Sequence, residues 1–265
     1  MSDVKYPVCS RVGGYVLGIA GELGAAALML KSTVFWAFKS RLEVRETMKQ
    51  SVKIGVDSVG VTALTSFFTG MVLALQTGAT SKNLFNEPLY IGTLVSFSMV
   101  KELGPVLTSI VVAGRAGAVV TAEIGTMRVT EQIDALYTLG THPARYLLVP
   151  RYIAFLVTLP LLVVLANFIG TIGGFIIATT RLQVPSTVYW NDIFTFMDIN
   201  DFMHGFLKTF AFAFMIATVS CHKGMTTRGG AEGVGKSTTE AVVTSMVLVM
   251  VIDYFISAVL VAVGI

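Results

Sequence analysis

The chain of 265 residues is 54% hydrophobic and only 13% charged, and its mean hydropathy is +0.75. A soluble globular domain carries roughly a quarter charged residues, so this composition excludes an ordinary water-exposed fold and indicates an integral membrane protein. The formal net charge of +3 is too small to indicate a protein that binds nucleic acid.

The first apolar stretch, residues 12–40, is interrupted by Glu22 and Lys31. We expect it to form a helix that lies in the cytoplasmic interface of the membrane, with Trp36 and the lysines at headgroup level. A sixth membrane span and a cleaved signal peptide are the two alternatives. Asp3 argues against the signal peptide because it spoils the basic start that such peptides need.

Five later segments are long and apolar enough to cross a bilayer, which takes roughly 20 apolar residues. They are residues 54–80, 90–120, 152–180, 205–221 and 241–263. In the third segment, Gly170 and Gly174 are four residues apart and permit a neighbouring helix to pack closely. The sequence therefore predicts an all-α, polytopic membrane protein with five transmembrane helices, in which residues 1–265 form a single domain.

Basic residues are distributed unequally over the segments that flank the spans. Residues 31–53, 78–89, 121–151, 180–203 and 222–239 hold six, one, three, one and three basic residues, respectively. Cytoplasmic loops are enriched in lysine and arginine. Five crossings with a cytoplasmic N-terminus and an exported C-terminus satisfy this alternation throughout.

Ionisable residues interrupt two of the predicted spans. Lys101 and Glu102 lie about a dozen residues into the second span, and Asp253 lies near the middle of the fifth. Each such charge costs at least about 2.5–3.5 kcal/mol and usually marks a cavity or a pathway. Pro105 adds to this by leaving the Lys101 carbonyl without its helical donor. We expect these residues to border a polar cavity or a helix–helix interface, with Asp253 as a candidate partner of Lys101; a purely structural ion pair is the alternative.

Residues 123–139, between the second and third spans, are predicted to form an amphipathic helix. Val129, Ile133 and Leu136 fall on one face at helical spacing, and Gly140 is a stop signal. A short amphipathic helix on the basic side of the membrane either lies on the bilayer or docks into a groove of a partner. The periodicity does not decide between these two roles.

The segment Gly230–Ser237 fits the nucleotide-binding pattern G-x-x-x-x-G-K-[ST] letter for letter. Such a loop needs a buried strand before it and a helix of an α/β sheet after it, whereas its neighbours here are membrane spans. We interpret the match as a coincidence and the segment as a flexible cytoplasmic loop, with Ser237 or Thr238 capping the last helix. The chain shows no arrangement of catalytic or metal-binding residues, so it is not expected to be an enzyme.

Several blocks of the sequence resemble the permeases of the MlaE/YrbE family, the membrane subunits of MCE-associated ABC transporters. The matching blocks are Phe68–Gln76 (FTGMVLALQ), Lys101–Val106 (KELGPV), Ala113–Gly117 (AGRAG) and Thr121–Gln132 (TAEIGTMRVTEQ), together with Pro150-Arg151 and Asp253. The likeness covers nearly the whole chain and is densest from Phe68 to Arg151.

This resemblance implies a homodimeric permease with an N-terminal interfacial helix, five spans and a coupling helix, in the bacterial inner membrane. It implies transport of phospholipids or related lipids between the inner and outer membranes, which bears on outer-membrane lipid asymmetry. The implied partners are cytoplasmic ABC ATPase subunits, which carry the ATP and magnesium, a periplasmic MCE-domain protein and a small STAS-domain regulator. No cofactor is expected on this chain.

Carried over residue by residue, the resemblance implies two functional regions. The coupling helix to the ATPase would use Glu123, Met127, Arg128, Glu131 and Gln132. The lipid cavity would be lined by Leu75, Gln76, Lys101, Glu102, Pro105 and Asp253. One departure is Lys101, where the family often has arginine. Lysine keeps the positive charge but cannot bind a carboxylate or phosphate through two parallel hydrogen bonds as arginine does.

Two other classes of protein compete with this interpretation. The first is an ion- or proton-coupled secondary transporter that uses Glu102 and Asp253 as relay groups. Secondary transporters commonly contain internal repeats, and five spans with one amphipathic segment do not divide into halves. The second is a membrane scaffold that only anchors an ATPase.

Overall fold

The apolar runs fold into helices, because a helix satisfies its own backbone hydrogen bonds where no water is available. The computed structural model describes residues 7–39, 43–85 and 90–263, and these ranges contain no β-strand. Five helical segments in them are long and apolar enough to span a membrane: Val44–Lys82, Ile91–Val129, Ala144–Thr180, Ile199–Met225 and Gly230–Val263. The predicted all-α, polytopic fold is confirmed.

The first three spans are built from consecutive helical pieces, some of which are π-helical and are labelled η. The first span comprises α2 (Val44–Ser51), η1 (Val52–Val56) and α3 (Asp57–Phe85). The second comprises α4 (Ile91–Ser98), η2 (Met99–Leu103), α5 (Gly104–Val112), η3 (Ala113–Gly117) and α6 (Ala118–Val129). The third comprises η4 (Ala144–Leu148) and α8 (Val149–Thr180). Each π-helical turn in the described chain carries at least one charged residue, and such turns are frequent at functional sites.

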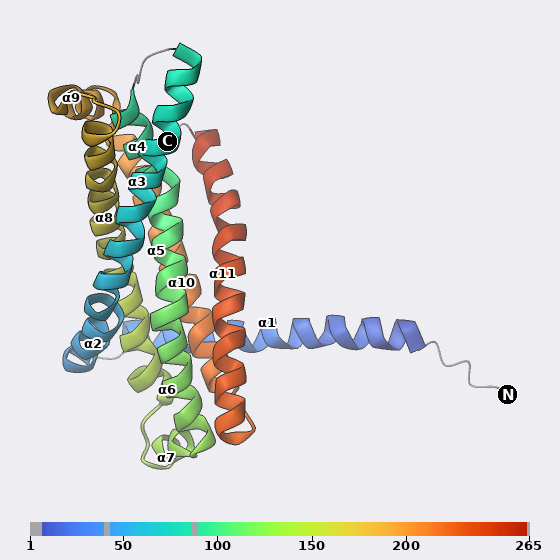
Figure 1. Ribbon diagram of the computed structural model, residues 1–265. Coiled ribbons are helices and arrows are strands. Elements are labelled where there is room, and N and C mark those ends of the chain that lie inside the picture. Colours follow the sequence, from blue (N-terminus) through green and yellow to red (C-terminus); the bar gives the residue numbers. More distant parts are fainter. Residues whose placement is uncertain (1–6, 40–42, 86–89, 264–265) are drawn as a thin grey trace.

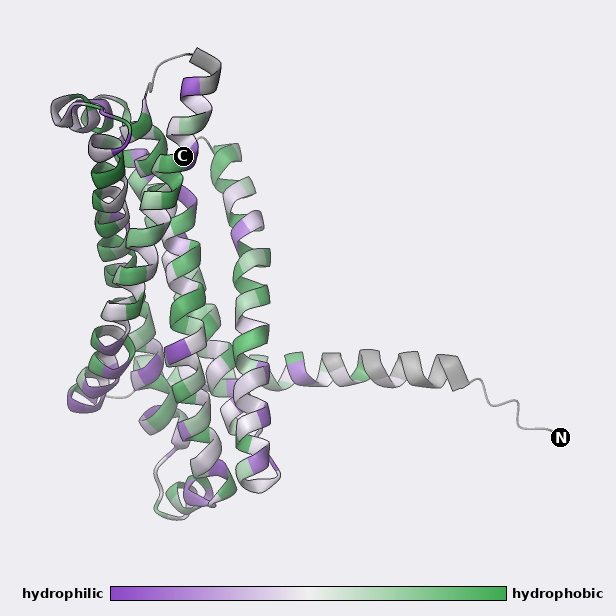
Figure 2. Cartoon of the chain, in the orientation of Figure 1, coloured by the Kyte–Doolittle hydropathy of each residue, from purple (hydrophilic) through white to green (hydrophobic). Residues whose placement is uncertain are grey.

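The fourth and fifth spans are the single helices α10 (Ile199–Met225) and α11 (Gly230–Val263). Shorter helices lie at the two ends of the bundle: α7 (Gln132–Thr138) at one end and α9 (Ser186–Phe196) at the other. We refer to these as the α7 end and the α9 end. Hydrophobic residues dominate the middle of the bundle, and hydrophilic residues gather around α2 and α7 (Figure 2).

Helix α1 (Pro7–Lys39) lies across the bundle instead of along it and extends away from it near the α7 end (Figure 1). It contacts η4, α8 and α10 through its C-terminal part. It is not among the five helices that qualify as membrane spans. Helix α1 is thus set apart from the five spans, and its location in the membrane interface stays a prediction.

Glycine allows the first and third spans to pack closely. A Cβ atom on Gly70 of α3 would lie 1.8 Å from the carbonyl oxygen of Gly170 of α8, and one on Gly173 would lie 2.3 Å from that of Phe67. A Cβ on Gly174 would lie 2.7 Å from Val95. The predicted close packing at Gly170 and Gly174 is confirmed, because larger side chains would separate the helices.

Helix α9 was not anticipated from the sequence. It begins after Pro185, and its Tyr189 is fully buried against α4 and α8. The Tyr189 hydroxyl donates a hydrogen bond to the Thr171 carbonyl at 3.0 Å. Burial raises the pKa of this phenol above its ordinary value, so the hydroxyl remains a donor that fixes α9 to the end of α8.

The segment with the nucleotide-binding pattern is helical, so the prediction of a flexible loop capped at Ser237 or Thr238 is wrong. Gly230–Ser237 forms the first two turns of α11. Gly229 and Gly230 have φ angles of 93° and 65°, a conformation that glycine adopts readily, and they make the turn from α10. The glycine at the start of the pattern thus serves a turn between helices.

Candidate functional site

The charged residues inside the spans gather around one residue that the sequence analysis overlooked, Lys208 of α10. Its side chain is fully buried. The ammonium nitrogen lies 2.7 Å from a carboxylate oxygen of Glu102 and 3.1 Å from one of Asp253. It also donates a hydrogen bond to the Lys101 carbonyl at 3.3 Å. The buried ammonium is thus surrounded by two carboxylates and one backbone carbonyl from the neighbouring helices.

Pro105 explains why the backbone oxygen of Lys101 is free to accept a hydrogen bond from Lys208. The residue four positions after Lys101 has no N–H, so the Lys101 carbonyl lacks its α-helical donor. The Lys208 ammonium replaces that donor from the neighbouring helix. Gly205 permits the close approach, because a Cβ there would lie 1.9 Å from the Val100 carbonyl oxygen and 3.2 Å from the Pro105 ring.

Lys101 pairs with a different carboxylate from the one predicted. Its ammonium lies 2.7 Å from Asp201 in the first turn of α10 and 4.3 Å from the centre of the Phe97 ring. The prediction that Asp253 is its partner is therefore wrong. Neighbouring residues on a helix point in directions about 100° apart, so Glu102 faces Lys208 and Asp253 while Lys101 faces the start of α10.

These five residues form what we call the Lys208 cluster: Lys101, Glu102, Asp201, Lys208 and Asp253. Two cations and three carboxylates give it one uncompensated negative charge at full ionisation. The Glu102 side chain is 45% exposed, and its second oxygen accepts a hydrogen bond from Ser257 of α11 at 3.2 Å. The cluster is thus not sealed inside the bundle, since its outermost carboxylate can reach a polar group that approaches from outside.

The remaining residues proposed for a lipid cavity lie on two helices. Pro105 is buried beside the cluster in α5. Leu75 and Gln76 lie on the exposed side of α3 and take no part in the polar contacts of the cluster. The fold therefore gathers Lys101, Glu102, Pro105 and Asp253 around Lys208, whereas the role of Leu75 and Gln76 stays a prediction.

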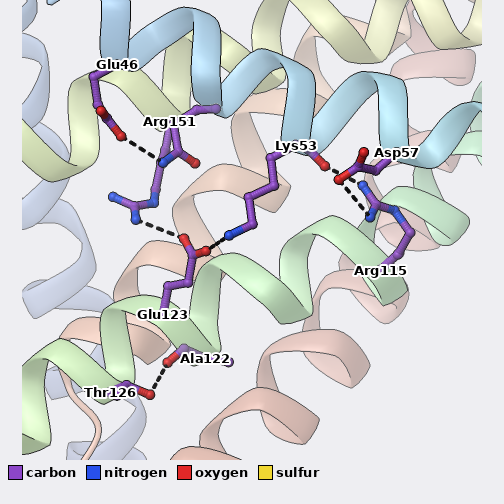
Figure 3. Close-up of polar contacts among 9 residues, drawn as sticks. Glu46, Lys53, Asp57, Arg115, Ala122, Glu123, Thr126 and Arg151 are labelled. Carbon is purple, nitrogen blue, oxygen red and sulfur yellow. Dashed lines mark hydrogen bonds and ion pairs between the residues drawn. The ribbon is translucent and has the colours of Figure 1, made fainter.

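A second group of charges joins the first three spans near the α7 end (Figure 3). The Glu123 carboxylate of α6 binds the Lys53 ammonium of η1 and, at 3.1 Å, the Arg151 guanidinium of α8. The Arg151 side chain is only 6% exposed and also donates to the Leu147 carbonyl at 2.8 Å. We call Lys53, Glu123 and Arg151 the Glu123 cluster.

Arg115 of η3 adds a further link between the first two spans. Its guanidinium donates to the Ser58 hydroxyl at 2.9 Å and to the Lys53 carbonyl, and lies 4.0 Å from Asp57 (Figure 3). Arg115 and the Glu123 cluster together connect the start of the first span to the second and third spans. A change at the α7 end can therefore reach three spans through charged contacts.

The predicted helix over residues 123–139 is interrupted, so the prediction of one continuous helix is wrong. α6 ends at Val129 and α7 starts at Gln132, and Glu131 between them has a φ angle of 60°. Nothing in the local sequence signals this break, because no glycine or proline lies there. Ile133 is buried, as its place on the predicted apolar face requires.

The five proposed coupling residues consequently differ in their surroundings. Glu123 faces inward in its cluster, and Met127 is half-buried against the core. Arg128 pairs with Asp134 at 2.8 Å across the turn between α6 and α7. Glu131 and Gln132 are exposed at the tip of the bundle. The tip thus offers polar groups to a partner, beside the exposed hydrophobic side chains of Tyr137 and Leu139.

The five apolar helices and the charges held between them define a multi-pass α-helical membrane protein. A family model described as Permease MlaE matches residues 47–259. The chain belongs to this permease family and is a permease subunit.

Similar proteins support the same assignment. A protein of Rickettsia typhi named as a probable ABC transporter permease is 40% identical over 253 residues, which cover 96% of this chain and 97% of that protein. A Synechocystis protein with the same description is 41% identical over 233 residues, or 88% of each chain. The chloroplast protein TRIGALACTOSYLDIACYLGLYCEROL 1 of Arabidopsis thaliana is 36% identical over 221 residues, which cover 83% of this chain and 63% of that protein.

Proposed function

We propose that this chain is the permease subunit of an ATP-driven ABC transporter that moves phospholipids or related lipids between membranes. The observation that carries the proposal is the half-exposed Glu102 carboxylate of the Lys208 cluster, held inside the bundle of spans. A charge at that depth is stabilised only if a polar group or water meets it. A lipid brings a polar headgroup on an apolar body, which suits a path through such a bundle.

The name of one relative supports a lipid as the substrate class. The name of the Arabidopsis relative contains that of a glycerolipid, trigalactosyldiacylglycerol. In the fold, the first and fifth spans are the least covered by neighbouring helices. Only 28% and 11% of the residues in their most apolar stretches are buried, compared with 56% in each of the other three spans. We infer that a second copy covers these faces and that the homodimer encloses a cavity lined by Leu75, Gln76, Glu102 and Asp253.

A separate ATPase would supply the energy by gripping the tip formed by α6 and α7. The tip is connected to the first and third spans through Glu123, Lys53 and Arg151, so a displacement of α6 would be transmitted to both. ATP and magnesium would be held by that partner. The pattern at Gly230–Ser237 contributes nothing to nucleotide binding in this proposal, because it is the regular start of α11.

The proposed orientation places the α7 end in the cytoplasm and the α9 end on the far side of the bacterial inner membrane. The described parts of the basic flanking segments 31–53, 121–151 and 222–239 all lie toward the α7 end (Figure 1). A periplasmic MCE-domain protein would then meet the α9 end, and a small STAS-domain regulator would act with the ATPase.

Reversing the charge at the tip is expected to weaken assembly with the ATPase. Glu131 is exposed and in no ion pair that the structure describes, so Glu131→Lys alters the docking surface without disturbing the core. We expect co-purification of the ATPase to fall several-fold, with the thermal unfolding temperature of the permease unchanged. Asp192→Lys at the α9 end is the control and leaves co-purification intact. Equal recovery of the ATPase with both variants would contradict the coupling assignment.

Reconstitution in liposomes with the co-purified partners tests the function itself. Movement of a fluorescent phospholipid out of the proteoliposomes is expected to require ATP and to stop with a non-hydrolysable analogue. Movement driven by a proton gradient without ATP would support a secondary transporter that uses Glu102 and Asp253 as relays. No lipid movement under either condition would favour a membrane scaffold that only anchors the ATPase, and would refute the proposal.

A further inference from the structure

The surface of helix α9 is divided into stripes whose members are four residues apart. Tyr189 and Ile193 are buried against α4 and α8. Trp190 and Phe194 lie on the flank next to them, and Phe194 is 79% exposed. The following stripe is polar and exposed, and its members are Thr187, Asn191 and Thr195. A helix with an apolar and a polar side is amphipathic, and here an aromatic flank separates the buried side from the polar one.

The aromatic flank of α9 continues a row of apolar side chains on α8. Leu161, Phe168 and Phe175 are seven residues apart and therefore lie on one side of α8. Leu161 and Phe168 are 65% and 63% exposed. The Phe175 ring packs against Trp190 with 5.5 Å between the ring centres, and Trp190 stacks on Phe194 at 6.4 Å. One apolar surface thus runs along α8 and turns onto α9.

The part of this surface on α8 faces lipid tails. Leu161 and Phe168 belong to the third span, in a run without charged residues between Arg151 and Arg181. The inferred second copy covers the first and fifth spans, which leaves the third span open to the bilayer. An exposed apolar row at that depth is a lipid-facing surface.

The end of the same surface reaches the headgroup level. Phe175 follows Arg151, the last charged residue before the apolar run, by 24 residues. At the rise of an α-helix this distance is about 36 Å, slightly more than the roughly 30 Å of a hydrocarbon core. The packed rings of Phe175, Trp190 and Phe194 therefore lie where the core ends. Tryptophan is enriched at this level in membrane proteins, because its ring is apolar and its N–H is polar.

We propose that α9 is an interfacial helix that inserts the flank of Trp190 and Phe194 into the headgroup region of the bilayer. Its polar stripe then faces water. Helix α9 lies across the end of α8 (Figure 1), which is the orientation that this role requires. A soluble protein is the competing occupant of the flank, but it would leave the continuation of the surface onto Phe168 unexplained. The inference rests on the chain spanning a membrane and is independent of what it transports.

Anchoring α9 in this way fixes the start of the next span. Only Met197 and Asp198 separate α9 from α10. Asp201, in the first turn of α10, pairs with Lys101. The insertion of α9 thus sets the depth at which the Lys208 cluster begins.

Tryptophan fluorescence of the full chain in lipid nanodiscs tests this inference. The chain contains two tryptophans, Trp36 and Trp190, so replacing both with phenylalanine gives a background without the fluorophore. In this background, Phe194→Trp and Thr195→Trp each place one reporter on α9, in directions about 100° apart. Both positions are exposed, so neither substitution disturbs the packing of the bundle. Phosphatidylcholine brominated near the headgroup is the quencher in the bilayer, and acrylamide is the quencher in water.

We expect the brominated lipid to quench Phe194→Trp several-fold more strongly than Thr195→Trp, and acrylamide to quench them in the opposite order. Lipid brominated near the end of its chains is expected to quench Phe194→Trp more weakly, because the flank lies at the edge of the core. Leu161→Trp in the same background is the depth control, and the chain-end bromine is expected to quench it best.

Acrylamide quenching of Phe194→Trp as strong as that of Thr195→Trp would place the flank in water and overturn the inference. Protection of Phe194→Trp from both quenchers would show that protein covers the flank, which overturns it equally. Should the tryptophan-free background fail to fold, the same two substitutions in the wild-type chain decide, because Trp36 and Trp190 contribute equally to both signals. A chain that transports no lipid would leave each of these outcomes unaffected.

Discussion

Replacing Lys208 with methionine is expected to destabilise the protein by about 3–5 kcal/mol, the cost of removing one partner from a buried ion pair. Lys208→Met leaves Glu102 and Asp253 facing each other without a cation and frees the Lys101 carbonyl again. For a chain of this size the unfolding temperature in mild detergent is expected to fall by roughly 6–20 °C. Circular dichroism during heating measures the shift.

The control for this prediction is the same substitution at an exposed lysine. Lys82→Met near the end of α3 is expected to change stability by less than about 0.5 kcal/mol. Adding Asp253→Asn to Lys208→Met removes one of the two unpaired carboxylates and is expected to recover part of the loss. An unfolding temperature for Lys208→Met that equals that of Lys82→Met would show that the cluster contributes nothing to the fold.

Removing the carboxylate from the Glu123 cluster is expected to cost about 3 kcal/mol, for the same physical reason. Glu123→Ala leaves the Arg151 guanidinium buried and the Lys53 ammonium beside it, with no anion between them. Because the cluster joins η1, α6 and α8, the variant is also expected to increase hydrogen exchange at the start of the first span. Hydrogen exchange followed by mass spectrometry reports both the size and the place of the effect.

An exposed ion pair at the same end of the molecule provides the comparison. Asp134→Ala breaks the contact with Arg128, both of whose side chains are well exposed, and such pairs contribute less than about 1 kcal/mol. If Glu123→Ala were no more destabilising than Asp134→Ala, the Glu123 cluster could not be the link between the tip and the spans.

The number and type of the spans could be predicted because an uncharged run of roughly 20 residues has few stable solutions in lipid. The ends of the helices could not. Polar and charged residues beside an apolar run do not stop a helix, so the helices extend beyond the apolar runs that predict the spans. Thus α11 begins at Gly230, well before residue 241, and α10 begins at Ile199 and so brings Asp201 into its first turn.

The candidate site was predictable in composition but not in pairing. The cost of charge in a span picked out Lys101, Glu102 and Asp253, and the same argument applied to the fourth span would have identified Lys208. The partners depend on how neighbouring helices are rotated, which periodicity does not contain. The break at Glu131 is of another kind, since a non-glycine residue with positive φ is held there by the surrounding fold and has no local signal.

The claim on which this account depends is that the Lys208 cluster borders the lipid path, and Glu102→Gln tests it most directly. This variant keeps the contact between Lys208 and Asp253 and removes only the exposed charge. In proteoliposomes that contain the ATPase, we expect ATP-driven lipid movement to fall at least about tenfold, the equivalent of one charge-assisted interaction. Assembly is expected to be unchanged, and the loss of unfolding temperature to be smaller than that of Lys208→Met, because Lys208 keeps its contact with Asp253. Lipid movement at the wild-type rate would contradict the account.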